Sequence, residues 1–254
     1  MRFEISEKKK RDQFIYIFNH LKNFTDKLSL NISEDKLYIQ GMDANHVCVY
    51  ELFLLKEWFD LWNVTENKTY GVSLHIFNKI LNICSEKQKI IITNDNDDKL
   101  DIEFISDEKG EFNKYFAMPL FDIDDEMMSI PEQEYDVDIE MESKKFKSLI
   151  EELTKFNDTL SLVCNEEELL LKSESEEGTM KAVININDIE LLAVIEGNTL
   201  EISFGIKYIS QICQFYKLSN NCCIHISDGV PLLFKYDLGN DCIMRFYLAP
   251  KFND

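Results

Sequence analysis

The chain has 254 residues, of which 45% are hydrophobic, and its formal net charge is −20 at pH 7. This length fits one large domain or two of ordinary size, since domains usually contain about 100–200 residues, and the apolar content excludes an intrinsically disordered chain. The charge excludes general attraction of the whole surface to nucleic acid or anionic membranes, so contact with DNA would require a local basic region. The sequence has no apolar run of the roughly 18 residues that a membrane helix needs and no signal-peptide core, so we expect a soluble, intracellular protein without membrane partners.

The cysteine and histidine patterns argue against a metal centre or redox chemistry. The seven cysteines are odd in number, form no C-x-x-C motif and lie mostly within apolar runs, which favours buried, reduced thiols. The four histidines are scattered, and no two have the spacing of metal ligands. We therefore expect no metal and no cofactor.

The first half of the chain predicts a short strand, a helix and then a series of strands. Phe14, Ile17, Phe18, Leu21 and Phe24 recur at helical spacing. Short alternating segments follow at 28–32, 37–39, 47–49 and 52–54, with a turn at 34–36 between the first two. A second helix is predicted over 73–84, and a hairpin over 90–105 with its turn at 94–99.

The stretch Met127–Met141 (MMSIPEQEYDVDIEM) joins this half to the next. Its Ile-Pro dipeptide disfavours a helix at Ile130. From Tyr135 onward, apolar and acidic residues alternate with the period of a half-buried strand. The segment is therefore predicted to be an extended connector that continues into the first strand of a second unit.

The second half repeats the first at a constant offset of 132 residues. Residues 14–30 (FIYIFNHLKNFTDKLSL) align with residues 146–162 (FKSLIEELTKFNDTLSL), so that Phe14 pairs with Phe146 and Leu21 with Leu153. A helix is predicted over 204–216 and a hairpin over 224–236, with its turn at 227–229. Two copies of a fold of roughly 125 residues explain this self-similarity better than coincidence. Each copy combines two helices with many short antiparallel strands, which is the α+β class.

Several separated motifs resemble those of the eukaryotic-type sliding DNA clamp, the proliferating cell nuclear antigen family. They are Gln40–Val47 (QGMDANHV), Tyr70–Leu74 (YGVSL), Ile130–Tyr135 (IPEQEY), Gly229–Leu232 (GVPL) and Tyr247–Lys251 (YLAPK). They occur in the family's order and spacing across essentially the whole chain.

This resemblance implies two clamp domains, at residues 1–119 and 136–254, joined by a connector at 120–135. It implies a homotrimeric ring, with helices lining the hole and antiparallel sheets outside, that encircles duplex DNA as a processivity factor in replication and repair. The implied partners are DNA polymerase, a clamp loader of the replication factor C type, flap endonuclease, DNA ligase and other proteins that carry the clamp-binding motif. The implied location is the nucleus, or the viral replication site if a virus encodes the chain. No enzyme is implied, and the sequence has no P-loop, no G-x-G-x-x-G and no G-x-S-x-G.

The family binds its partners in a shallow apolar pocket beside the connector. The matching positions are Met42, His46, Val47, Val49, Ile130, Pro131, Tyr135, Pro231, Tyr247, Leu248, Ala249 and Pro250. An apolar patch on a strongly acidic surface is typical of a binding site. Val47 and Val49 also fit ordinary strand core, and Pro131 and Pro250 also fit a purely structural role. The backbone at 251–254 would be open to a partner's extended arm.

The family lines its hole with basic residues from the helices, and these contact phosphates without reading sequence. Lys22, Lys79 and Lys207 match such positions, and Arg11, Lys144, Lys147 and Lys155 are neighbouring candidates. Ile15, Tyr16, Ser148 and Glu151 stand where the family has basic residues, so the chain departs from the family on this face. A merely solvated helix face is the alternative for each lysine.

For the ring, the resemblance pairs the strand around Tyr115, Phe116 and Met118 with the strand around Thr179, Lys181 and Val183 of the next subunit. Pro119 would limit the length of that pairing. Glu166 stands where the family has the lysine that accepts ubiquitin, so no such modification is expected there.

Two alternatives remain. A subunit of a checkpoint-type heterotrimeric clamp would share the fold but lack a good docking pocket. A cysteine-dependent enzyme would need a Cys/His pair in an electropositive cleft, which the sequence does not indicate.

Overall fold

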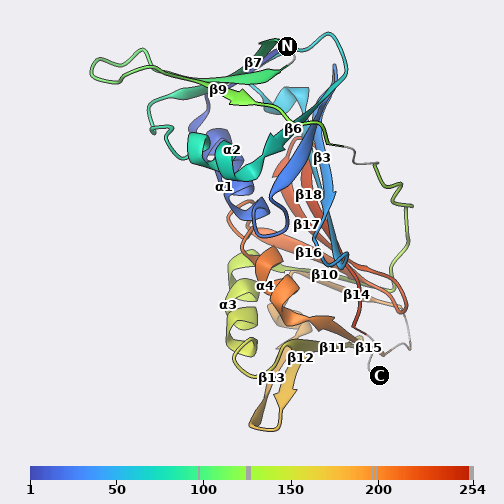
Figure 1. Cartoon of the computed structure of the whole chain (residues 1–254). Coiled ribbons are helices and arrows are strands. Elements are labelled where there is room, and N and C mark those ends of the chain that lie inside the picture. The colour runs from blue at the N-terminus through green and yellow to red at the C-terminus, as the bar shows by residue number, and fades with distance from the viewer. Residues whose placement is uncertain (97, 124–126, 196, 198, 252–254) are drawn as a thin grey trace. The chain divides into compact units, whose positions relative to one another are not determined.

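The computed structural model describes residues 1–96, 98–123, 127–195, 197 and 199–251. The chain forms two compact units (Figure 1). Unit 1 comprises Met1–Ala44, Glu51–Met128 and Gly239–Ile243, and unit 2 comprises Asn45–Tyr50, Ser129–Leu238 and Met244–Asp254. The domain limits at 1–119 and 136–254 remain a prediction.

The elements occur in two runs of identical order. The first run is β1 (Arg2–Ile5), α1 (Lys8–Leu21), β2 (Lys27–Ile32), β3 (Lys36–Met42), β4 (Cys48–Leu55), the 3₁₀ helix η1 (Lys56–Trp58), β5 (Leu61–Asn63), β6 (Lys68–Ser73), α2 (Leu74–Leu81), β7 (Lys89–Asn96), β8 (Lys99–Ile105) and β9 (Lys114–Pro119). The second run is β10 (Val137–Glu142), α3 (Ser143–Leu153), β11 (Thr159–Cys164), β12 (Glu168–Ser175), β13 (Gly178–Asn185), η2 (Ile186–Asp188), β14 (Leu191–Val194), β15 (Leu200–Gly205), α4 (Ile206–Cys213), β16 (Asn221–Ile226), β17 (Leu232–Gly239) and β18 (Cys242–Leu248). The duplication predicted from the offset is therefore a duplication of whole elements.

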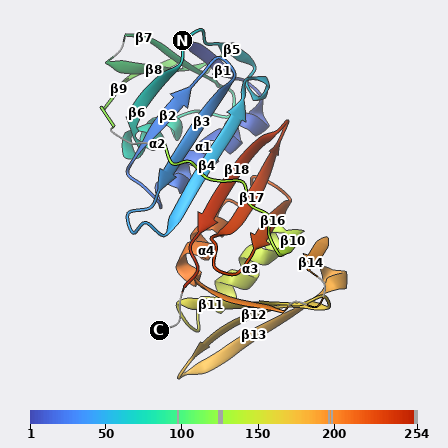
Figure 2. The same cartoon turned by 90° about the vertical axis from the view of Figure 1, so that its right-hand side faces the viewer.

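The strand orders repeat as well. The order β5-β1-β7-β8-β9 in the first run recurs as β14-β10-β16-β17-β18 in the second, and β4-β3-β2-β6 recurs as β13-β12-β11-β15. The pairing is antiparallel, for example between β1 and β7, β8 and β9, β10 and β16, and β12 and β13. Figure 2 shows β2, β3 and β4 side by side, and β16, β17 and β18 side by side. The α+β prediction is confirmed.

The helices lie where the hydrophobic spacing predicts them. In unit 1, α1 packs against α2, and α2 packs against β2 and β6 (Figure 1). In unit 2, α3 packs against α4 and β10, and α4 packs against β15. Phe14, Ile17 and Leu21 of α1 are buried, as are Phe146, Ile150 and Leu153 of α3. Each helix therefore covers the core with one apolar stripe and leaves its polar face outside.

Some predicted boundaries differ from the observed ones. Residues 48–49 of one predicted segment and the whole of the segment 52–54 belong to a single strand, β4 (Cys48–Leu55). Strand β7 continues to Asn96, three residues into the region predicted as a turn. Helices α2 (Leu74–Leu81) and α4 (Ile206–Cys213) are shorter than the predicted segments 73–84 and 204–216 at both ends. The turn predicted at 227–229 does separate β16 from β17.

Candidate docking and DNA-contact sites

All of the predicted docking residues except Met42 belong to unit 2. The backbone N–H of Ala249 donates to the carbonyl of Val47 at 3.0 Å, so the segment after β18 lies beside the segment before β4. Val47, Val49 and Pro250 are half-buried, whereas His46, Pro131 and Pro231 are exposed. Leu248 is fully buried, so its side chain belongs to the core, and we exclude it from the proposed docking surface.

The loop that carries His46 has a fixed local geometry. His46 has a φ of 57°, the left-handed conformation that few non-glycine residues adopt. The side chain of the preceding Asn45 donates to the Tyr208 hydroxyl on α4 at 2.9 Å. Sequence reasoning missed Tyr208, because nothing in the pattern connects a residue on α4 to this loop. The structure thus holds the loop before β4 from within unit 2.

The end of the connector is attached to β16 and to the turn that follows it in unit 2. The Tyr135 ring lies 5.6 Å from the His225 imidazole on β16, centroid to centroid. The N–H of Asp136 donates to the Ser227 hydroxyl at 2.7 Å. Burial raises the pKa of the Tyr135 phenol, so this hydroxyl stays neutral under ordinary conditions. Tyr135 is therefore held as an apolar surface with a polar tip.

The start of the connector is attached to unit 1. Phe121 forms an isolated bridge with Gly71 of β6, and its N–H donates to the Gly71 carbonyl at 2.9 Å. The Lys27 ammonium lies 5.4 Å from the centre of the Phe121 ring. A glycine within a strand pattern is a known signal of close backbone approach, so Gly71 could have been recognised from the sequence. Met42, the remaining docking candidate, is half-buried at the end of β3 in unit 1.

The C-terminal strand end is less open than predicted. The N–H of Lys251 donates to the Ser203 carbonyl of β15 at 2.7 Å, and its ammonium donates to the Thr159 hydroxyl at 2.6 Å. Residues 252–254, which complete the predicted β-addition site, lie outside the described residues. A cavity of about 440 Å³ next to this segment is lined by Ser161, Glu201, Ile202, Ser203, Asp228, Gly229, Pro250 and Lys251.

Most of the predicted DNA-facing lysines are exposed. Lys22 and Lys79 belong to the α1 and α2 region, and Lys144, Lys155 and Lys207 to the α3 and α4 region. Lys155 and Lys207 share an open hollow of about 650 Å³ between the end of α3 and the start of α4. Lys147 is mostly covered, since it pairs with Glu151 and lies 5.1 Å from the centre of the Tyr216 ring. Its ammonium is therefore less available than the other five.

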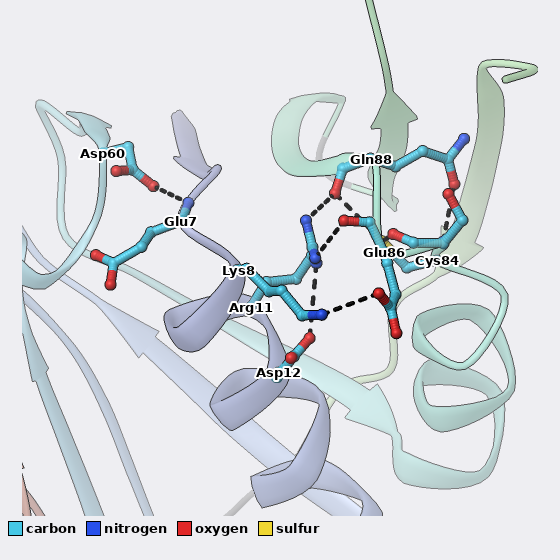
Figure 3. Close-up of polar contacts among 9 residues, drawn as sticks. Glu7, Lys8, Arg11, Asp12, Asp60, Cys84, Glu86 and Gln88 are labelled. Carbon is cyan, nitrogen blue, oxygen red and sulfur yellow. Dashed lines mark hydrogen bonds and ion pairs between the residues drawn. The ribbon is translucent and has the colours of Figure 1, made fainter. Parts of the chain in front are cut away.

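Arg11 has a structural role that excludes it from the DNA-facing set. Its side chain is only 4% exposed, and its guanidinium donates to the carbonyls of Gln88 and Glu86, each at 2.6 Å (Figure 3). Gln88 in turn donates to the carbonyls of Phe104 and Phe112. Arg11 therefore fixes the segment between α2 and β7 from inside. We correct the expectation that it faces DNA, because a buried, engaged guanidinium cannot reach a phosphate.

The predicted ring-forming strands are both edge strands. β9 ends one strand order and β13 ends the other. Tyr115 on β9 is 65% exposed, and Val183 on β13 is 55% exposed. Thr179 and Lys181 are exposed on the same face of β13 as Val183, and Phe116 is half-buried. Met118 is 1% exposed, so its side chain belongs to the core of unit 1 and only its backbone is available at the edge.

The cysteines lie in apolar surroundings. Burial raises the pKa of Cys84 to about 11 and that of Cys164 to about 12. All seven cysteines are reduced thiols outside any disulfide, and the described residues contain no group of three or more potential metal ligands. Thiols with raised pKa values are poor nucleophiles at neutral pH, which argues against cysteine catalysis.

The structure also bears on Glu166 and on the expected absence of a membrane helix. The Glu166 carboxylate accepts the N–H of Gly197 at 2.7 Å, so it has a local structural partner. Among the described residues, no helix is long and apolar enough to cross a membrane.

Taken together, a duplicated α+β unit with paired helices, exposed lysines and free strand edges defines the class of DNA sliding clamps. Two family models match nearly the whole chain: the N-terminal domain of proliferating cell nuclear antigen over residues 8–127 and its C-terminal domain over residues 129–251. The chain belongs to the proliferating cell nuclear antigen family. Its function is that of a DNA sliding clamp, a processivity factor that tethers other proteins to DNA.

Individual relatives agree with this assignment. Proliferating cell nuclear antigen of Chaetomium thermophilum is 28% identical over 244 residues, covering 94% of both chains. The crystal structure of the Thermococcus kodakaraensis protein has a TM-score of 0.88 at 18% identity, covering 98% of this chain and 99% of that one. The Entamoeba histolytica structure has a TM-score of 0.87 at 24% identity, covering 99% and 98%. A PCNA2–PCNA3 complex from Sulfolobus tokodaii also has a TM-score of 0.87, at 21% identity, covering 99% of each chain.

Proposed function

We propose that this clamp is a homotrimer in which β9 of one copy pairs with β13 of the next. Within the chain, the repeat counterparts of these strands, β18 and β4, are hydrogen-bonded neighbours. One end of that pairing belongs to unit 1, where the N–H of Leu55 donates to the Cys242 sulfur at 3.2 Å, and the other belongs to unit 2, where Ala249 donates to Val47. The same pairing between copies would use both free edges, and head-to-tail pairing that closes forms a ring without exposed edges.

The exposed side chains on these two edges support the proposal. Tyr115 and Val183 are large apolar groups left in water in the isolated chain. Burying them between copies recovers hydrophobic free energy that the isolated chain lacks. This match of two free edges, each with an apolar residue, is the observation that carries the proposal.

For DNA contact we propose the exposed lysines Lys22, Lys79, Lys144, Lys155 and Lys207, with Lys147 in a lesser role. These five exposed lysines, which lie in or next to the helices, give local positive charge to a strongly acidic chain. Such charge suits contact with the phosphates of DNA, which does not depend on base sequence. Four positions that are basic in the family are not basic here, namely Ile15, Tyr16, Ser148 and Glu151. We therefore expect weaker contact with DNA than a fully basic set would give.

For partner docking we propose the surface of unit 2 that carries His46, Val47, Val49, Ile130, Pro131, Tyr135, Pro231, Tyr247, Ala249 and Pro250. Met42, which belongs to unit 1, remains a separate candidate. Its proposed ligands are the clamp-binding motifs of DNA polymerase, the replication factor C type loader, flap endonuclease and DNA ligase. A buried aromatic anchor from the ligand would supply most of the affinity. The proposed location is the nucleus, or a viral replication site if the chain is virus-encoded.

The decisive experiment is primer extension on a circular template with a polymerase, a clamp loader and this protein. We expect long products that depend on both loader and clamp, and short products with Tyr115→Ala. Products of equal length with and without the clamp would contradict the proposal. Sizing of the purified chain alone separates the alternative, since a subunit of a heterotrimeric clamp would not form a trimer by itself.

A further inference from the structure

The side chain of Gln40 on β3 binds the backbone of the connector at Met128. Its Nε2 donates to the Met128 carbonyl at 2.9 Å, and its Oε1 accepts the Met128 N–H at 2.7 Å. Both hydrogen bonds of one connector residue are thus supplied by a single amide, as a neighbouring strand would supply them.

A buried carboxylate fixes the orientation of this amide. Glu51 is buried, and its Oε1 accepts the Tyr38 hydroxyl at 2.6 Å and Gln40 Nε2 at 3.4 Å. Because Glu51 Oε1 accepts in both contacts, the NH₂ end of Gln40 is the end nearest Glu51. Its second N–H then points at the Met128 carbonyl, which leaves Oε1 for the Met128 N–H. The group Tyr38–Glu51–Gln40 is therefore preset to receive the connector.

The position of Met128 in the connector makes this contact consequential. The connector is hydrogen-bonded at Phe121 by Gly71 and at Asp136 by Ser227. Met128 lies midway between these two residues, and the proposed docking residues Ile130, Pro131 and Tyr135 follow it directly. Without the Gln40 contact, the span from Met128 to Asp136 would be held at Asp136 alone, and a span held at one end has more conformations to lose on binding.

We propose that Gln40 is a positioning residue that orders the connector in advance of partner binding. The proposal rests on the docking site proposed above. Gln40 need not touch the ligand. It raises the fraction of molecules whose connector is already in the binding-competent conformation, and apparent affinity scales with that fraction.

The test uses the full-length protein, a short synthetic peptide with the clamp-binding motif, and amide hydrogen exchange. Gln40→Ala removes both hydrogen bonds, and Gln40→Glu removes the donor and places a second carboxylate beside Glu51. We expect faster exchange at the Met128 amide and a peptide Kd raised about tenfold, as when the competent fraction falls to about one tenth. Thr69→Ala is the matched control, because it removes one exposed side-chain hydrogen bond, to Asn31, from the same group of strands.

A structural role alone would not give this pattern. The proposal requires that the sizing profile and thermal midpoint of Gln40→Ala stay close to those of the control. Unchanged exchange at Met128, or faster exchange with unchanged peptide Kd, overturns it. If the unmodified protein does not bind the peptide, the docking site is wrong, while the exchange rate at Met128 still decides whether Gln40 holds the connector.

Discussion

At the scale of single residues, burial decides which basic groups can act on a ligand. Arg11 and Lys22 belong to the same helical region and carry the same charge, but one is enclosed and the other exposed. The Arg11 guanidinium donates to two backbone carbonyls of the segment before β7. Its charge therefore stabilises unit 1, whereas the charge of Lys22 is free to contact phosphate.

Arg11→Ala should lower the free energy of unfolding by about 2–4 kcal/mol, because it removes two hydrogen bonds from a buried charged donor to the carbonyls of Gln88 and Glu86. Urea denaturation measures this change. Lys9→Ala, an exposed neighbour on α1, is the control and should change stability by less than about 0.5 kcal/mol. If the Arg11 variant were as stable as the control, the structural role assigned to this guanidinium would be wrong.

Cys164 predicts a loss of stability in alkali. Burial raises its pKa from 9.0 to about 12, so above pH 9 the unfolded chain releases a proton that the native chain keeps. The free energy of unfolding should fall between pH 9 and 12, by at most about 1.4 kcal/mol per pH unit for this group. Urea unfolding below and above pH 9 should show a shallower decline in Cys164→Ala. Leu162→Ala, which removes no ionisable group, should keep the original slope.

At the scale of elements, a glycine in β6 lets the start of the connector pack against that strand, and the helices bring lysines that are distant in the sequence close together. Gly71 of β6 allows Phe121 to approach as a bridge partner, and a side chain there would prevent it. Lys155, just after α3, and Lys207, at the start of α4, line the same hollow. The sequence of neither helix alone indicates this.

Gly71→Ala should release the start of the connector. A Cβ at this position would lie 2.1 Å from the Phe121 carbonyl oxygen and 2.6 Å from Ile123 Cγ1. Overpacking of this kind costs about 1–3 kcal/mol. We expect faster chymotryptic cleavage at Phe121 and a lower urea midpoint. At Gly178 the nearest atom would be 3.9 Å away, so Gly178→Ala should show neither effect.

Removing helix lysines should reduce the salt dependence of DNA binding. Each lysine–phosphate contact contributes about 0.9 to the slope of log K against log salt concentration. Lys79→Ala with Lys207→Ala should therefore lower the slope without changing base preference, as measured by fluorescence anisotropy at several salt concentrations. Lys56→Ala, which removes an exposed partner of Asp35, is the control. An unchanged slope in the double variant would place the DNA elsewhere.

At the scale of the whole molecule, the free strand edges determine assembly. β4 and β18 are hydrogen-bonded neighbours within the chain, whereas their repeat counterparts β13 and β9 each lie at the end of a strand order. The chain therefore presents two different surfaces that a second and third copy can pair.

Tyr115→Ala and Val183→Asp should each shift the protein from trimer to monomer in analytical ultracentrifugation. The first removes apolar area, and the second places a charge where water is excluded. Leu61→Ala is the matched control, since Leu61 is exposed on β5, the opposite end of the same strand order. Met118→Ala should instead lower the stability of unit 1, because its side chain is buried. A Tyr115 variant that stayed trimeric would contradict the proposed interface.

The amino-acid sequence by itself determined the duplication, the α+β class and the family. Hydrophobic spacing is local, so the helix stripes at Phe14–Leu21 and Phe146–Leu153 and the 132-residue offset could be read without coordinates. The docking segments were predictable as motifs, but their mutual contacts were not. Only the tertiary structure showed that Ala249 bonds Val47, that Arg11 and Met118 are enclosed, and that Gln40 holds Met128. Burial and hydrogen-bond partners depend on residues far apart in the chain, and no local pattern records which of them the fold brings together.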